Sequence, residues 1–344
     1  LKRLLFGRPL ASDEAGHQLL PKSLALPVFS SDALSSVAYA TEEITIVLIA
    51  AGAVALRYVT PIAIAIGALL LIVVVSYRQT VRAYPSGGGA YIVSRENLGE
   101  NPGLIAAAAL MVDYVLTVSV SVVAGVAAIS SAVPSLASHR VLLSIVFVVF
   151  ITLMNLRGVR ESGVLFAVPT YAFIASIYVM LVVGFVSCVG GCPTAAAPAV
   201  PPETMGSVTL FLLLRAFASG STALTGVEAI SNGVPAFRRP QARNAAGTLA
   251  IMGVISVTMF LGISYFARAF SVIPITEKMV EHGAEYQTVV AQIAQTIFGR
   301  GGMFFVIQTA TAMILILAAN TAYQDFPRLG SILARDRYMP RQFM

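Results

Sequence analysis

Eight long apolar segments constrain what this chain can fold into. They run over residues 24–51, 61–77, 103–132, 141–156, 163–189, 208–234, 245–270 and 303–323. Each is close to the length of an α-helix that crosses the hydrocarbon core of a bilayer. A composition of 57% hydrophobic and 11% charged residues excludes an ordinary soluble domain. The fold class predicted is therefore an all-α polytopic membrane protein with about eight transmembrane helices.

The basic residues indicate the orientation of these helices. Most of the 22 Lys and Arg residues lie in loops on one side of the expected spans, and the other side holds only Arg57, Arg140, Arg268, Lys278 and Arg300. Because cytoplasmic loops are enriched in Lys and Arg, we predict a cytoplasmic N-terminus, with residues 1–23 as an N-terminal arm. The net charge of +6 follows from this topology, so no nucleic-acid partner is expected.

An aspartate, Asp32, lies within the first apolar segment in a stretch rich in serine. An ionised side chain is costly at that depth and usually has a function. The stretch is repeated in the sixth segment, because residues 31–37 and 221–227 share Ser, Ala, Leu and Val at the same positions. In the predicted topology the two copies run in opposite directions, which is typical of inverted-repeat transporters. We therefore expect helices 1 and 6 to be broken and unwound, within a first repeat at 24–190 and an incomplete second repeat at 206–344.

The third segment contributes a polar helix face. Asp113, Thr117 and Ser121 are spaced four residues apart and so point to the same side, with Tyr114 beside them. A single Ser or Thr in a membrane helix often bonds only its own helix or a neighbour. An acid within the same span is harder to explain structurally. This face is therefore predicted to line a polar site.

Two further stretches supply oxygen ligands to the same predicted site. Glu228 follows Thr225 in the sixth segment, and Tyr39 lies about two helical turns after Asp32 in the first. Carboxylate, hydroxyl and carbonyl oxygens suit a hard cation or protons. Glu228 is the first candidate for the proton carrier and Asp113 is the second. The predicted cation-binding set is Asp32, Tyr39, Asp113, Thr117, Ser121, Thr225 and Glu228.

Four other residues allow more than one interpretation. Glu42 lies farther along the first segment, where it is either a solvated vestibule charge or a site residue. Arg215, in the sixth segment, is either a vestibule charge or a partner for one of the acids. Cys188 and Cys192 could form a short disulfide outside the membrane, although two unpaired cysteines at a helix end is the interpretation we favour.

The remaining motifs do not indicate a cofactor. The glycine-rich loop at 84–103 lacks the Lys and the Ser or Thr of a P-loop, so we predict a cytoplasmic hinge or re-entrant connection. His17, His139 and His282 all lie outside the expected spans, so neither a haem nor a zinc site is indicated. No cofactor is expected.

Several long strings resemble those of the KimA-type potassium importers, relatives of the KUP potassium transporters in the amino acid, polyamine and organocation superfamily. They include SSDALSSVAYATEE, YPSGGGAYIVSRENLGENPGLIAA, VDYVLTVSVS, MNLRGVRES, ALTGVEAISNGVPAFRRPQARNAAGTLA and ARDRYMPRQF. The resemblance implies a LeuT-type fold that imports K⁺ together with H⁺ across a bacterial plasma membrane. It implies the same cation-binding positions, with Tyr114 nearby.

The resemblance also implies features outside this chain. Members of the family continue through further helices into a cytoplasmic domain and form homodimers, so we expect this chain to be part of a longer protein. The family often has Gln at the position of Glu43 and Lys at that of Arg215. Either difference could change proton coupling or vestibule charge without removing the site.

Two other functions remain as alternatives. An amino-acid or polyamine permease of the same superfamily is the first, but Asp32 would repel the carboxylate of an amino acid. The second is an intramembrane aspartyl protease that uses Asp32 and Asp113 as a dyad. The Gly-x-Gly-Asp context expected of such a protease is absent, so we predict a transporter and not an enzyme.

Overall fold

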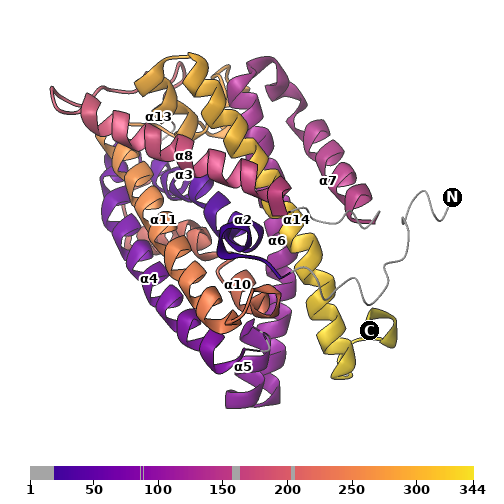
Figure 1. Cartoon of the computed structure of the whole chain (residues 1–344). Helices are drawn as coiled ribbons and strands as arrows, with labels where there is room; N and C mark the ends of the chain where they lie inside the picture. The colour runs from indigo at the N-terminus through magenta and orange to yellow at the C-terminus, as the bar shows by residue number, and fades with distance from the viewer. Residues whose placement is uncertain (1–18, 86, 88, 157–162, 203–205) are drawn as a thin grey trace.

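The computed structural model describes residues 19–85, 87, 89–156, 163–202 and 206–344 (Figure 1). These residues form a bundle of helices and contain no named strand. Most of the N-terminal arm expected at 1–23 lies outside the described residues, as does the basic stretch at 157–162. The predicted all-α class is confirmed.

The eight apolar segments all lie in helices. In chain order these are α2 (Lys22–Ser35) with α3 (Val37–Ile49), α4 (Val59–Ala83), α6 (Glu100–Ala132), α7 (Arg140–Leu156), α8 (Gly163–Ser187), α9 (Leu210–Gly220) with α10 (Glu228–Asn232), α11 (Gln241–Ala269) and α14 (Gly302–Arg335). Shorter helices connect them: η2 (Ala53–Tyr58), α5 (Gly89–Leu98), η3 (Pro134–His139), η4 (Ser221–Leu224), η5 (Val234–Ala236), α12 (Glu277–Glu281), α13 (Val289–Phe298) and η6 (Arg341–Phe343).

Length and apolar composition confirm the membrane class. Within the described ranges, 7 helical stretches are long and apolar enough to cross a membrane. The first segment is not among them because it is divided into α2 of 14 residues and α3 of 13 residues. Neither half alone reaches the length that a bilayer requires. The chain is therefore a multi-pass membrane protein whose first segment is interrupted.

The interruption of the first segment is smaller than expected. Ser36, which separates α2 from α3, keeps helical dihedral angles of φ −61° and ψ −25°. The hydroxyls of Ser35 and Ser36 donate to the carbonyls of Asp32 and Ala33, each at 2.9 Å. These serines compete with the helical hydrogen bonds without opening the backbone. The first helix is interrupted at one residue but is not unwound.

The sixth segment is broken as expected. After α9 ends at Gly220, the short helix η4 leads to Thr225, which is extended at φ −62° and ψ 152°. Gly226 then has a φ of +76°, a left-handed conformation that glycine adopts at low cost. Helix α10 begins two residues later, at Glu228.

Two local predictions need correction. The loop expected at 84–103 contains the helix α5, because Tyr91 is buried among side chains of α6 and α14 and fixes the segment against them. Cys188 and Cys192 form a disulfide, contrary to the interpretation that we favoured. Helix α8 ends at Ser187, and the turn after it brings the two Cα atoms to 4.0 Å.

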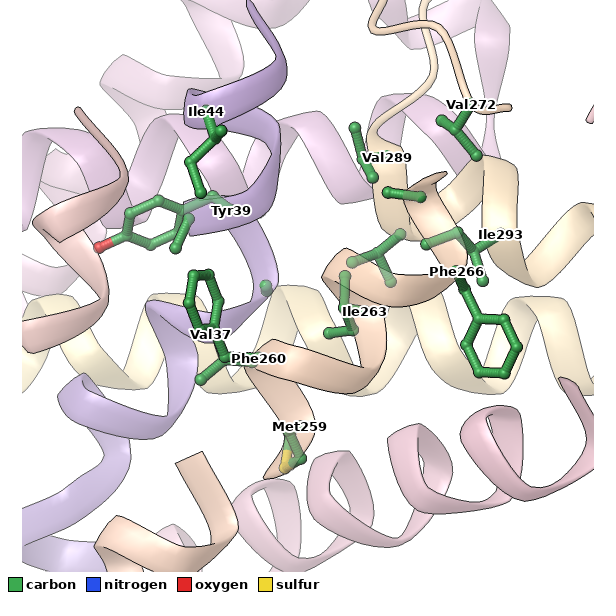
Figure 2. Packing of buried hydrophobic residues seen from close by; sticks show 14 of the residues in the cluster. Val37, Tyr39, Ile44, Met259, Phe260, Ile263, Phe266, Val272, Val289 and Ile293 are labelled. Carbon is green, nitrogen blue, oxygen red and sulfur yellow. The ribbon is translucent and has the colours of Figure 1, made fainter. Parts of the chain in front are cut away.

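The main core joins the second half of the first segment to α11 and α13. Figure 2 shows Ile44 of α3, Phe260 and Ile263 of α11, and Val289 of α13 as part of one buried cluster. Lipid tails are as apolar as these side chains, so close packing holds such helices together in a bilayer. Helices α13 and α5 lie toward opposite ends of the bundle (Figure 1). The two ends are accordingly the α13 side and the α5 side of the molecule.

Candidate functional site

Asp32 packs directly against the break in the sixth segment. A Cβ added to Gly226 would lie 2.6 Å from the Ala33 nitrogen and 2.8 Å from Cγ of Asp32, so only glycine permits this approach. Asp32 is 6% exposed, and its Oδ1 atom has no hydrogen-bond partner among the described residues. A buried polar atom without a partner costs free energy. Oδ1 of Asp32 is therefore a buried acceptor that the described residues leave unused.

Three more acids surround Asp32. Asp113 of α6, Glu228 of α10 and Asp325 of α14 are all close enough to interact with it electrostatically. Glu228, which is 9% exposed, also interacts with Asp113 and Asp325. Among the described residues these acids do not form a cluster of metal-chelating geometry. They form an acidic group between four helical elements, α2, α6, α10 and α14.

Tyr39 connects the first segment to the sixth. It lies on α3, is buried, and interacts with Asp32 and with the side chain of Thr225. Its hydroxyl points away from the rest of the labelled core cluster (Figure 2). The Thr225 hydroxyl donates to the Thr222 carbonyl at 2.9 Å. The structure thus places Asp32, Tyr39, Asp113, Thr225 and Glu228 in one region.

Thr117 and Ser121 lie one and two turns after Asp113 on α6. Both are buried, and the Ser121 hydroxyl has no hydrogen-bond partner among the described residues. No described contact joins either residue to Asp32 or Glu228. Their assignment to the site rests on their spacing along α6, so it remains a prediction.

A cavity of about 820 Å³ opens on the α5 side of these acids. Tyr114, Asn232 and Asp325 line it together with residues of α5 and the end of α14. The Asn232 side chain donates to the Tyr114 hydroxyl at 3.4 Å. Tyr114 therefore lines the α5-side cavity and also interacts electrostatically with Asp325, Glu228 and Asp113.

A smaller cavity of about 300 Å³ opens on the α13 side. Tyr39, Glu42 and Glu43 line it, and Tyr286 and Thr288 lie across from them. Asp32 and Glu228 line neither this α13-side cavity nor the α5-side one. Asp32 and Glu228, which we call the central acids, are thus enclosed between the two cavities, whereas Asp325 lines the α5-side cavity.

Glu42 is 7% exposed and lines the α13-side cavity. Its Oε2 atom accepts a hydrogen bond of 3.3 Å from the Val289 N–H at the start of α13, and the Tyr286 hydroxyl also bonds it. Burial and then the charge of Glu42 raise the pKa of Tyr286, so this hydroxyl stays protonated and donates. Glu42 therefore fastens α3 to the beginning of α13.

Arg215 does not pair with an acid among the described residues. It is exposed on α9, one turn before Ser219, whose hydroxyl donates to Oε2 of Glu43 at 2.9 Å. Of the two interpretations of Arg215, the partner of a buried acid is therefore not supported. The other interpretation, in which Arg215 is an exposed vestibule charge, remains a prediction.

Four residues near the site were missed by the sequence analysis. Asp325 and Thr321 belong to α14, Asn232 ends α10, and Tyr77 of α4 interacts with Glu228 and Asp113. The apolar segment marked at 303–323 stops before Asp325, although α14 continues to Arg335. The four-residue spacing of Thr321 and Asp325 was the available signal, because it puts them on one helix face.

Comparison with known proteins gives three results. Residues 24–344 match the model of the amino acid permease family. The potassium transporter KimA of Bacillus subtilis is 50% identical over 344 residues, which is 100% of this chain and 55% of that protein. The low-affinity putrescine importer PlaP of Escherichia coli K12 is 22% identical over 276 residues, 80% of this chain and 58% of that protein. The chain thus spans little more than half the length of these relatives.

Proposed function

Since the chain belongs to the amino acid permease family of membrane transporters, we propose that it imports K⁺ together with H⁺ across a bacterial plasma membrane by alternating access. The observation that carries the proposal is the buried, unpartnered Oδ1 atom of Asp32 where the two interrupted helices meet. The similarity to a potassium transporter, at 50% identity, favours K⁺ as the cation. Pairing as a homodimer remains an expectation for the full-length protein.

The distribution of charge supports the orientation. Helix α5 lies on the side whose loops are rich in Arg, which the positive-inside rule assigns to the cytoplasm. The α13-side cavity is then the entrance from outside, and the α5-side cavity is the exit. In this proposal Tyr39 lies at the outer boundary of the site and Tyr114 at the inner one.

Each predicted residue has a role in this mechanism. K⁺ exchanges its water for oxygens of the site, and Asp32 supplies the negative charge that makes the exchange favourable. Thr225 and Tyr39 orient the oxygen ligands of K⁺ at the break in the sixth segment. Thr117 and Ser121 extend the row of hydroxyl groups along α6. The set is the one predicted above: Asp32, Tyr39, Asp113, Thr117, Ser121, Thr225 and Glu228.

Glu228 is the residue we assign to proton coupling, with Asp113 as the second candidate. Glu228 is buried at the start of the short helix α10 and interacts with Asp113 and Asp325. A carboxyl group that loses its proton on the cytoplasmic side and regains it outside can link H⁺ flow to K⁺ flow. Because close acids titrate together, the proton belongs to Glu228 and Asp113 as a pair when the two are coupled.

Polyamine uptake is the second candidate function. The match to a putrescine importer covers 80% of this chain, and a polyamine is an organic cation that an acidic site also suits. An amino acid fits less well, because its carboxylate would approach the carboxylates of Asp32 and Glu228. Identity of 22% against 50% places this candidate second.

The proposal is tested by uptake into a bacterial strain that lacks its own K⁺ importers. The strain carries the full-length gene or its Asp32→Asn variant, and growth is measured at micromolar K⁺ together with uptake of radiolabelled putrescine and amino acids. We expect the unmodified protein to restore growth and Asp32→Asn to fail, with both present in the membrane in equal amounts. Asp32→Asn keeps the shape of the side chain and removes only its charge.

Two outcomes would overturn the proposal. An unmodified protein that reaches the membrane, does not restore growth and takes up putrescine would establish the polyamine candidate. Restored growth with Asp32→Asn would remove Asp32 from the cation site. Competition of excess unlabelled putrescine with K⁺ uptake separates a shared site from a specific one.

A further inference from the structure

A partly buried ion pair lies next to the central acids on the α5 side. The side chain of Arg328 donates to Oδ1 of Asp325 at 2.7 Å. The Asp325 side chain is 8% exposed and that of Arg328 is 48% exposed. Exposed ion pairs contribute little, but a buried carboxylate without a positive partner is strongly unfavourable. An ionised Asp325 therefore needs a cation beside it, whether that cation is Arg328 or another.

Asp325 faces the proposed cation site. Thr321, one turn earlier on the same face of α14, shares a hydrogen bond of 3.1 Å with Ser31, which precedes Asp32. Asp32 and Glu228 both interact electrostatically with Asp325. A cation that leaves Asp32 toward the α5 side thus passes the negative charge of Asp325.

Asp325 and Arg328 also face the α5-side cavity. Both line it, together with Tyr114 and Asn232. Asp325 therefore borders the central acids and the open cavity at the same time. This position lies between the enclosed site and the proposed exit.

The helix can bend between the two members of the pair. Pro327 lies within α14 directly before Arg328, and it has no N–H to donate to the carbonyl of Tyr323. Helices bend most readily at such positions. Arg328 is half-exposed, so it can leave Asp325 without breaking packing in the core.

We propose that Asp325 is a transit site for the departing cation and that Arg328 displaces the cation from it. The inference rests on the proposed function and adds a residue pair to the same pathway. When no cation is present, the guanidinium of Arg328 neutralises Asp325. A cation that arrives from Asp32 takes the place of this guanidinium beside Asp325, and the return of Arg328 expels that cation into the α5-side cavity.

The test measures K⁺ binding and rubidium uptake separately in the purified full-length protein. Binding is followed as K⁺-dependent thermal stabilisation, and uptake as the maximal initial rate in proteoliposomes. In Arg328→Gln no guanidinium competes with K⁺ for Asp325, so K⁺ should bind more tightly and leave more slowly. We therefore expect the K⁺ dissociation constant to fall about fivefold or more, and the maximal rate of uptake to fall about fivefold or more, as for two coupled sites. Arg328→Lys keeps the charge and serves as the matched control, with both values expected close to those of the unmodified protein.

The double variant Asp325→Asn/Arg328→Gln tests the proposal even if Arg328→Gln does not fold, because it leaves no buried charge unpaired. We expect ordinary K⁺ affinity and a maximal rate lowered about fivefold. Tighter K⁺ binding that persists in the double variant, or a double variant that transports at the unmodified rate, would overturn the inference. A structural pair would lower thermal stability in Arg328→Gln without tightening K⁺ binding. Absence of K⁺ binding by the unmodified protein would instead refute the proposed function itself.

Discussion

Gly226 and Asp32 are packed so closely that a Cβ on the glycine would lie 2.8 Å from Cγ of the aspartate. Gly226→Ala would also force a side chain onto a backbone with φ of +76°, which costs about 1–3 kcal/mol in strain. We expect this variant to melt at a lower temperature and to lose K⁺ uptake. Gly302→Ala is the control, because nothing lies within 4 Å of its Cβ position. Normal uptake by Gly226→Ala would show that the contact with Asp32 does not shape the site.

Glu42 is expected to stabilise the α13 side without binding the transported cation. Removing its side chain in Glu42→Ala leaves the buried Val289 N–H without its acceptor, at a cost of about 1–3 kcal/mol. Glu42→Gln keeps an acceptor oxygen and should retain most of the stability. Thermal melting of the purified variants measures the difference. Loss of K⁺ uptake in Glu42→Gln at unchanged stability would instead place Glu42 in the transport pathway.

The contact between α5 and the end of α14 should depend on pH only in strong acid. Burial would raise the pKa of Asp336, but hydrogen bonds from Tyr91 and Arg95 lower it below the ordinary 3.8. Because the folded pKa is the lower one, the contact stabilises the protein above pH 3.8 and is lost as the pH falls through the folded value. Burial, followed by the bond to Asp336, raises the pKa of Tyr91 to about 12, so its hydroxyl remains a donor.

Hydrogen-exchange protection of the α5 amides measures this contact. We expect protection to be constant from about pH 5 to pH 8 and to fall in stronger acid. Asp336→Asn should lower it throughout that range, whereas Glu96→Gln, an exposed change on the same helix, should not. Equal protection in the unmodified protein and Asp336→Asn would show that other contacts hold α5 in place.

Much of this arrangement is predictable from the sequence because membrane segments have simple rules. Segment length and composition locate all eight segments, and the small polar stretch that ends at Val227 predicts the break before Glu228. The sequence analysis overestimated how far the first segment unwinds. The hydroxyls of Ser35 and Ser36 donate to nearby carbonyls of the helix and do not open it. Composition alone does not distinguish these two outcomes.

The residues that were missed depend on where helices extend and on what packs against them. Asp325 was overlooked because α14 continues past Pro327, whereas the apolar pattern stops at Tyr323. The burial of Glu42 depends on α13, a ten-residue helix that is too short to be recognised as a span. The position of Asp325 and the burial of Glu42 both depend on contacts between segments that are far apart in the chain. Such contacts follow from the fold and cannot be predicted from the local sequence pattern.

Glu228→Gln is expected to separate K⁺ binding from proton coupling. The glutamine keeps the size of the buried side chain and an acceptor oxygen, but it cannot release a proton at any pH of interest. In proteoliposomes with an internal pH dye, we expect K⁺ binding to persist while K⁺ uptake no longer acidifies the lumen or responds to an imposed pH gradient. Asp113→Asn is the matched variant, because Asp113 and Glu228 interact and only one of them need carry the proton. If Glu228→Gln still acidifies the lumen and Asp113→Asn does not, the role belongs to Asp113. If both variants remain partly coupled, the proton is shared by the pair, as close acids that titrate together allow.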